Sequence, residues 1–203
     1  MKGKFITFEG SEGSGKSTQA KLLLKYLRSH GKSAILIREP GSTKISEKIR
    51  KILLDPKNKE MCDEAEMLLY MASRAQLVRE LIIPQLKNGK FVICDRFLDA
   101  TICYQGYGGG LNIGLIKLVG KFATKGLKPD LTFLMDIDVR EGLRRAGRYK
   151  DRIEQKTLAY HKRVRKGYLH LSKLEPKRIK IITVEKNRMK TQRAIRNFVD
   201  KLI

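Results

Sequence analysis

A glycine-rich segment near the start of the sequence has the spacing of a phosphate-binding loop. Residues 10–17 read Gly-Ser-Glu-Gly-Ser-Gly-Lys-Ser and match the pattern GxxxxGK(S/T) at every fixed position. Glycines let consecutive backbone N–H groups point inward at phosphate oxygens. Lys16 would then reach the β- and γ-phosphates, and the Ser17 hydroxyl would bind Mg²⁺. The motif predicts a site for ATP or GTP. The residues expected at the nucleotide are Gly10, Ser11, Glu12, Gly13, Ser14, Gly15, Lys16, Ser17 and Thr18.

A carboxylate and a guanidinium follow a later apolar run. Asp95 and Arg96 come directly after Phe91-Val92-Ile93-Cys94, which has the composition of a buried strand. At the carboxyl edge of a parallel sheet, a carboxylate can hold Mg²⁺ or its waters, and an arginine can hold a phosphate. We therefore predict that Asp95 joins Ser17 as a metal ligand and that Asp95, Arg96 and Lys16 are catalytic. A polar pair that merely ends a strand is the competing interpretation.

A third candidate is a basic stretch between residues 140 and 152. It contains Arg144, Arg145, Arg148 and Arg152, interrupted by a glycine. Phosphoryl transfer spreads negative charge over the transferred group, and arginine forks match that charge. The stretch has the composition of a mobile lid that closes over a nucleotide. By itself the pattern is equally compatible with a solvated run of charge.

Apolar runs and helical patterns alternate along the chain. Short apolar runs predict strands at residues 4–8, 34–37, 91–94, 131–135 and 179–184. Helical spacing predicts helices within residues 20–27, 47–54, 63–85, 113–123, 153–174 and 195–202, with a flexible turn at 106–110. Strands that are apolar throughout and separated by helices predict a doubly wound α/β domain, with a five-stranded parallel sheet covered on both faces. We expect one domain over residues 1–203, with the lid at about residues 140–152.

Composition narrows the class of protein. The chain has 203 residues, of which 41% are hydrophobic and 32% charged, as in a folded globular protein. We see no apolar run near the ~20 residues of a membrane span and no export signal. The cysteines Cys62, Cys94 and Cys103 form no CxxC pair, so we expect reduced thiols and a cytoplasmic location.

The net charge is strongly positive. Lys and Arg number 44 against 21 Asp and Glu, which gives +23 at pH 7. Such a surface attracts polyanions, nucleic acid among them. The basic residues are spread along the chain and form no recognisable nucleic-acid-binding module. We therefore consider nucleic acid an unlikely partner.

Several segments, taken together and in this order, resemble the thymidylate kinase (dTMP kinase) family, and the resemblance covers nearly the whole chain. The matching segments are 8–13 (FEGSEG), 38–43 (REPGST), 95–97 (DRF), 104–108 (YQGYG), 151–154 (DRIE) and 160–168 (YHKRVRKGY). The resemblance implies a P-loop nucleoside monophosphate kinase fold. It also implies transfer of the γ-phosphoryl group of ATP to dTMP, which gives dTDP and ADP with Mg²⁺ and supplies dTTP for DNA replication.

The resemblance assigns roles at the phosphate and sugar of dTMP. Arg38 and Arg96 match the clamps on the dTMP phosphate. Tyr104 matches the ring that crowds the 2′ position and disfavours ribose, and Glu12 matches an acidic residue near the 3′-hydroxyl.

At the thymine base, Tyr70 takes the place of the aromatic ring that stacks on it. Arg74 matches the donor to a thymine carbonyl, and Thr101 and Gln105 lie where the family contacts the base. These four residues complete the expected substrate site.

The phosphate loop carries no arginine. In the branch of the family with that feature, the lid supplies the catalytic arginines, so the resemblance implies this role for Arg148 and Arg152 and a contact with adenine for Arg144 or Arg145. The family is typically homodimeric, which we adopt as an expectation.

Three alternatives remain open at this point. Another nucleoside monophosphate kinase would use a different base and would reject dTMP, because mismatched polar groups stay unpaired. A basic nucleic-acid-dependent ATPase would respond to DNA and to salt. An inactive nucleotide-binding protein is disfavoured because Lys16, Ser17, Asp95, Arg96 and Arg152 are all present.

Overall fold

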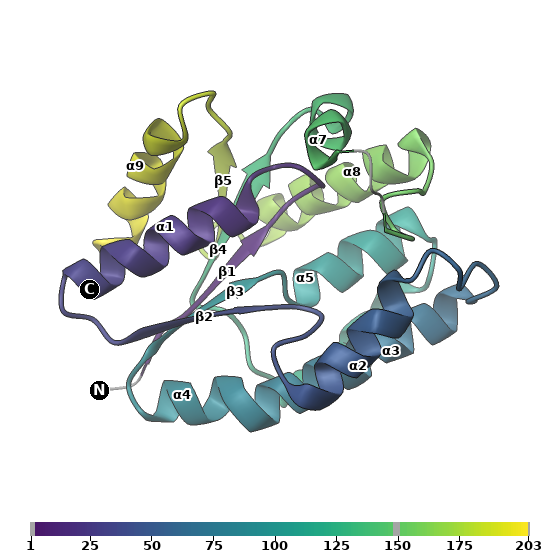
Figure 1. Cartoon of the computed structure of the whole chain (residues 1–203), viewed down its shortest axis with the longest axis horizontal. Helices are drawn as coiled ribbons and strands as arrows, with labels where there is room; N and C mark the ends of the chain where they lie inside the picture. The colour runs from purple at the N-terminus through teal and green to yellow at the C-terminus, as the bar shows by residue number, and fades with distance from the viewer. Residues whose placement is uncertain (1–2, 148–150, 203) are drawn as a thin grey trace.

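The computed structural model describes residues 3–147 and 151–202. Within these residues, five parallel strands form one sheet in the order β2-β3-β1-β4-β5 (Figure 1). The strands are β1 Phe5–Glu9, β2 Ala34–Arg38, β3 Phe91–Asp95, β4 Leu131–Asp136 and β5 Ile179–Thr183. Each lies within one residue of its predicted position at either end. The predicted five-stranded parallel sheet is therefore confirmed.

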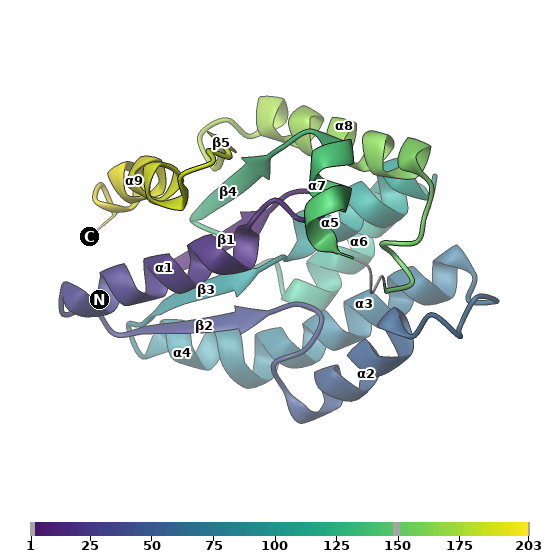
Figure 2. The ribbon, with the colours of Figure 1, turned by 45° about the horizontal axis from the view of Figure 1, so that its top comes forward.

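Helices cover both faces of the sheet, as Figure 2 shows. The α-helices are α1 Lys16–Ser29, α2 Lys44–Leu54, α3 Asp63–Leu77, α4 Ile83–Lys87, α5 Leu98–Thr101, α6 Ile113–Thr124, α7 Val139–Ala146, α8 Leu158–Leu174 and α9 Arg188–Val199. Side chains of α1 and α9 pack on one face. The helical run from α3 to α4, together with α6 and α8, covers the other. The doubly wound arrangement is thus confirmed.

The long helix predicted over residues 63–85 is interrupted but does not end at Pro84. A π-helical segment, η1 Val78–Ile82, connects α3 to α4, and Pro84 lies in the first turn of α4. A π-turn already breaks the regular hydrogen-bond ladder. A proline just after it therefore removes no hydrogen bond that the helix needs, because N–H groups in the first turn of a helix have no partner within it.

The flexible turn predicted at residues 106–110 is wrong over its first half. After α5, the chain forms a second π-helical segment, η2 Ile102–Gly108, which is mostly buried. A Cβ at Gly108 would lie 2.8 Å from side-chain atoms of Tyr160 and Val164. Glycine here serves the close packing of η2 against α8, rather than flexibility.

The helix predicted to begin at residue 153 begins at Leu158. The side chain of Thr157 accepts a hydrogen bond from the Tyr160 N–H at 3.2 Å and so caps the helix. Before it, the Asp151 carboxylate accepts the backbone N–H groups of Ile153 and Glu154, both at 2.9 Å. This side-chain turn competes with helix formation and shortens α8.

Candidate active site

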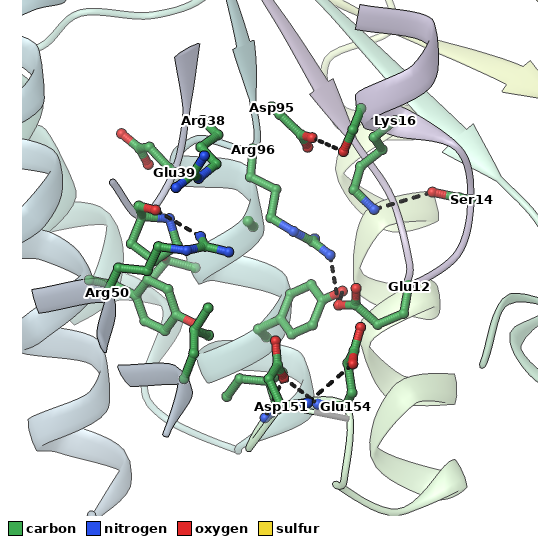
Figure 3. A pocket seen from close by; sticks show the side chains of 18 of the residues that line it. Glu12, Ser14, Lys16, Arg38, Glu39, Arg50, Asp95, Arg96, Asp151 and Glu154 are labelled. Carbon is green, nitrogen blue, oxygen red and sulfur yellow. Dashed lines mark hydrogen bonds and ion pairs between the residues drawn. The ribbon is translucent and has the colours of Figure 1, made fainter. Parts of the chain in front are cut away.

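A cavity of about 480 Å³ opens at the carboxyl ends of the strands (Figure 3). Its lining includes residues 12–18 of the glycine-rich loop and Asp95, together with the residues that the sequence assigned to dTMP. Besides Glu12 of the loop, the latter are Arg38, Tyr70, Arg74, Arg96, Thr101, Tyr104 and Gln105. Elements far apart in the sequence therefore place both sets of residues around one space.

The glycine-rich loop connects β1 to α1 and wraps around the Lys16 ammonium. Gly10, Gly13 and Gly15 all have positive φ angles, which side chains disfavour. Lys16 Nζ donates to the carbonyl oxygens of Gly10 and Ser11 at 3.1 and 2.7 Å. Burial, followed by the charge of Arg96, lowers the pKa of Lys16 to about 8. The cation is thus held where phosphate oxygens could replace the carbonyls.

Ser17 and Asp95 meet across the mouth of this loop. The Ser17 hydroxyl donates a hydrogen bond to Asp95 Oδ2, so the first turn of α1 and the end of β3 present adjacent oxygens. Hydroxyl and carboxylate oxygens are the hard ligands that Mg²⁺ accepts, usually with waters and substrate phosphates completing its shell. Among the described residues no cluster of three or more His, Cys, Asp or Glu could hold a metal. A site of one or two protein ligands fits this arrangement.

Arg96 occupies the centre of the cavity and is held by an internal anion. Its Nη2 donates to Glu12 Oε1 at 2.6 Å, and the Tyr104 hydroxyl donates to the same oxygen at 2.6 Å, as Figure 3 shows for Arg96 and Glu12. Burial acts to raise the pKa of Glu12, but Arg96 and Lys16 outweigh it and lower that pKa to about 2. Glu12 therefore stays ionised and occupies Arg96 in the free protein.

A buried carboxyl group behind Arg96, that of Glu9, fixes the backbone there, and the sequence did not single it out. Arg96 has a φ of 71°, which is costly for a residue with a side chain. The next residue, Phe97, donates its N–H to Glu9 Oε1 at 2.7 Å, and the Tyr168 hydroxyl donates to Glu9 Oε2 at 2.8 Å. Burial, reinforced by Asp99, raises the pKa of Glu9 to about 8. The FEG segment contained this residue, but nothing local distinguished it from other strand-ending acids.

The far end of the cavity combines an aromatic ring with a buried guanidinium. Tyr70 and Arg74 lie one turn apart on α3 and both line the cavity. Arg74 is 1% exposed; its Nε donates to Glu39 Oε2 at 2.7 Å and its Nη2 to the Phe97 carbonyl at 3.0 Å. Burial raises the pKa of Glu39 to about 7 despite this pairing. Gln105 lies at the same end and donates to Glu66.

Two arginines face the cavity from its β2 side. Arg38 is exposed, and its Nη2 contacts both carboxylate oxygens of Glu47 at 3.1 Å. Arg50, on α2, also lines the cavity and donates to the Pro40 carbonyl at 2.8 Å. Sequence reading did not single out Arg50, because it is one of many basic residues and its helical position alone carries no signal.

The expected lid is partly a helix that packs on the phosphate loop. A Cβ at Gly13 would collide with the carbonyl oxygen of Gly142, and one at Gly142 with the carbonyl oxygen of Glu12. This close approach of α7 brings Arg145 to the cavity lining. Its neighbour Arg144 is exposed and does not line the cavity; both pair with Glu141, at 2.8 and 2.7 Å.

Arg152 is not among the residues that line the cavity. Its side chain is 7% exposed and forms an ion pair with the buried Glu66 on α3, at 2.5 Å between Nη2 and Oε2. Its Nε donates to the Leu53 carbonyl at 2.9 Å. The expectation that Arg152 contacts the transferred group does not match this geometry, since the guanidinium pairs with Glu66 and does not line the cavity. Arg148 lies outside the described residues.

Comparisons with known proteins agree with this arrangement. The family model described as thymidylate kinase matches residues 8–195. A thymidylate kinase of Thermoanaerobacter sp. (strain X514) is 47% identical over 204 residues, covering 100% of both chains. That of Halothermothrix orenii is 48% identical over 200 residues and covers 96% of this chain and 95% of its own.

A solved structure shows the same fold. The crystal structure of thymidylate kinase from Ehrlichia chaffeensis superposes with a TM-score of 0.82 at 32% identity, covering 98% of this chain and 99% of that one. Among the described residues no helix is long and apolar enough to cross a bilayer. With a family match over most of its length and relatives at nearly half identity, the chain belongs to the thymidylate kinase family.

Proposed function

We propose that this protein phosphorylates dTMP to dTDP, with the γ-phosphoryl group of ATP, in the cavity between the phosphate loop and α3. Membership of the family supports the reaction and both substrates. One observation carries the site: a nucleotide-phosphate loop and an aromatic–arginine pocket open into the same space, with Arg96 between them. ATP on residues 10–18 would meet dTMP held by Tyr70 and Arg74 at its base.

The cations of the cavity offset the repulsion between the two nucleotides. Phosphoryl transfer through a loose transition state asks mainly for positioning and charge stabilisation. Lys16 and Arg145 approach from the ATP side, whereas Arg38 and Arg96 approach from the acceptor side. Arg148 remains a proposed catalytic arginine of the lid, and Arg144 a proposed contact to adenine. Asp95 would take part as a ligand of Mg²⁺, beside Ser17.

Ser17 and Asp95 would hold Mg²⁺. An ion held there would supply positive charge against the phosphate oxygens during transfer. Asp95 accepts the Ser17 hydroxyl in the free protein, so the two ligands are already adjacent. Their pairing keeps both oxygens turned toward the phosphate loop.

An acceptor panel tests the assignment. Purified protein with ATP and Mg²⁺ should release ADP at least ~10²-fold faster with dTMP than with UMP, CMP or AMP, because a hydrogen-bonding pocket rejects analogues that leave buried groups unpaired. Equal rates across the panel would remove the assignment.

A substitution locates the base-reading role. Arg74→Ala should reduce kcat/KM for dTMP by ~10²-fold or more and leave ATP affinity within about twofold, because Arg74 lies at the base end of the cavity. Exposed Arg79→Ala, one helical turn further along the chain, serves as the matched control. An Arg74→Ala enzyme with unchanged kinetics would refute the role.

We also propose that two copies associate through α6. The exposed apolar residues Leu115, Leu118 and Phe122 follow at helical spacing on α6, with Phe122 85% exposed, and Leu68 on the neighbouring α3 adds to them. A contiguous apolar face of this kind indicates a protein interface. The homodimer typical of the family would cover it.

The cysteines support a cytoplasmic location for this one-domain protein. Cys62, Cys94 and Cys103 are all free thiols. Unpaired thiols persist in compartments kept reducing by glutathione and thioredoxin.

A further inference from the structure

The amide of Gln105 is oriented by a residue behind it. Gln105 is 2% exposed, lines the base end of the cavity and donates from Nε2 to Glu66 Oε1 at 2.7 Å. A carboxamide has its donor and its acceptor on opposite arms. Because Nε2 is engaged by Glu66, the arm left for a ligand is Oε1. Within residues 3–147 and 151–202, no group donates to that oxygen.

Glu66 can hold only one orientation of this amide because it is an ionised acceptor. Its second oxygen, Oε2, lies 2.5 Å from Arg152 Nη2, and the two side chains are 3% and 7% exposed. A carboxylate paired with a guanidinium accepts hydrogen bonds and donates none. Gln105 must therefore turn its donor arm inward.

Arg152 is in turn fixed at the end of α2. Its Nε donates to the Leu53 carbonyl at 2.9 Å and its backbone N–H to the Leu54 carbonyl at 3.3 Å. Carbonyls in the last turn of a helix lack intrahelical partners and attract cations. A series of contacts, Leu53–Arg152–Glu66–Gln105, thus connects the end of α2 to the cavity wall.

This arrangement presents a pyrimidine with one fixed acceptor and one fixed donor. Gln105 Oε1 accepts and the Arg74 guanidinium can only donate. Thymine and uracil offer an N–H at position 3 and an oxygen at position 4, which complement the pair. Cytosine offers a lone pair at position 3 and an amino group at position 4, and therefore opposes both groups.

We propose that Glu66 and Arg152 are positioning residues that select thymine or uracil over cytosine by fixing the Gln105 amide. The proposal rests on the proposed function, because it requires dTMP in this cavity. It gives the buried pair a role in choosing the acceptor, distinct from phosphoryl transfer.

Glu66→Gln tests the proposal with little change in shape. Arg152 attracts the oxygen arm of the new amide and leaves its N–H arm facing Gln105, which must then turn over and present its own N–H to the cavity. The ratio of kcat/KM for dTMP over dCMP should fall by at least ~10-fold, the contribution of one buried hydrogen bond. Because dUMP shares the same edge as dTMP, the dTMP to dUMP ratio should stay within about twofold.

Exposed Glu64→Gln on the same helix is the matched control, and both ratios should remain those of the parent protein. A merely structural defect would lower activity on dTMP, dUMP and dCMP alike and leave both ratios unchanged, which would overturn the proposal. If the parent protein fails to use dTMP, the proposed function fails instead.

A measurement on the unsubstituted protein covers the case in which Glu66→Gln does not fold. With ¹⁵N-labelled protein, the side-chain NH₂ protons of Gln105 should exchange with water at least ~10²-fold more slowly than those of exposed Asn197. They should stay protected when dTMP binds. Rapid exchange of the Gln105 amide in the free protein would mean that Glu66 does not hold it, and would overturn the proposal.

Discussion

Each cation at the centre of the cavity already has an oxygen partner supplied by the protein. Lys16 is bonded to loop carbonyls, Arg96 to Glu12 and Arg74 to Glu39. Burying an unpaired charge would cost several kcal/mol. These internal partners therefore allow the cavity to keep its cations in the absence of nucleotides.

The pKa of Lys16 leads to a prediction for ATP binding. Because burial and Arg96 lower that pKa to about 8, the free protein loses this proton as pH rises above 8. Bound triphosphate needs the ammonium, so ATP binding must then take up a proton. The ATP dissociation constant should rise between pH 8 and 10 by up to about tenfold per pH unit, as calorimetric titration at fixed Mg²⁺ would show.

A control comes from the second substrate. Lys16 is remote from the base end of the cavity, so the dTMP dissociation constant should change much less over the same pH range. ATP affinity that stays constant from pH 7 to 9.5 would contradict the lowered pKa.

At the residue scale, sequence reasoning succeeded where chemistry is local. The phosphate loop and the Asp95-Arg96 pair were found because strand, turn and functional groups are adjacent in the chain. Arg152 was misplaced because its partner, Glu66, comes from a helix far earlier in the sequence. Arg145 was not preferred over its neighbours, since only the contact between Gly13 and Gly142 shows which arginine faces the loop.

At the level of elements, the side chain of Glu9 connects β1 to α5 and α8. From β1 it accepts the Phe97 N–H at the start of α5 and the Tyr168 hydroxyl of α8. A carboxyl group with a pKa raised to about 8 keeps its proton in the folded state, whereas the unfolded chain loses it near the ordinary glutamate pKa of 4.5.

The stability of the fold should therefore depend on this residue and on pH. The contribution of protonated Glu9 is complete below about pH 4.5 and is lost as pH rises toward 8. Glu9→Gln carries no such charge. The free energy of unfolding, measured in urea, should fall less for this variant than for the parent protein as pH rises from 5 to 8. The difference between the two proteins should change by at least about 1 kcal/mol in favour of the variant. Parallel pH profiles for the two proteins would contradict this.

The elements themselves were predictable to different degrees. Apolar runs marked all five strands, because a strand buried on both faces is apolar throughout. The segment η2 was mistaken for a turn, because Gly106 and Gly108 suggested flexibility. Their role is to let Ile113, Tyr160 and Val164 approach closely. Such packing depends on α6 and α8, which local composition does not reveal.

For the whole molecule, the alternation of strands and helices indicated a doubly wound fold. The strand order β2-β3-β1-β4-β5 came only from the structure. The basic residues behind the net charge of +23 are spread along the whole chain. The cavity uses a few of the 44 basic residues, and others pair with carboxylates elsewhere, as Arg165 does with Asp136 and Arg178 with Asp99.

The apolar face of α6 gives a prediction for the assembled protein. Size-exclusion chromatography with light scattering should show about twice the 23.3 kDa of one chain. Phe122→Glu should shift the protein to one chain, because a buried unpaired carboxylate at the interface costs several kcal/mol. Leu174→Glu, at an exposed leucine on α8, is the control and should leave two chains associated. A monomeric parent protein, or a dimeric Phe122→Glu variant, would refute the α6 interface.

The salt bridge between Glu12 and Arg96 has a consequence for how ligands are admitted. The Glu12 carboxylate takes the place of a substrate phosphate and holds the Arg96 guanidinium in position before any ligand binds. The entropy cost of ordering the Arg96 side chain is therefore met on folding and not on binding. A doubly charged phosphate can outcompete this resident group, whereas an uncharged nucleoside lacks the charge to displace it. The cavity thus selects its ligands by the charge of the phosphate as well as by the base.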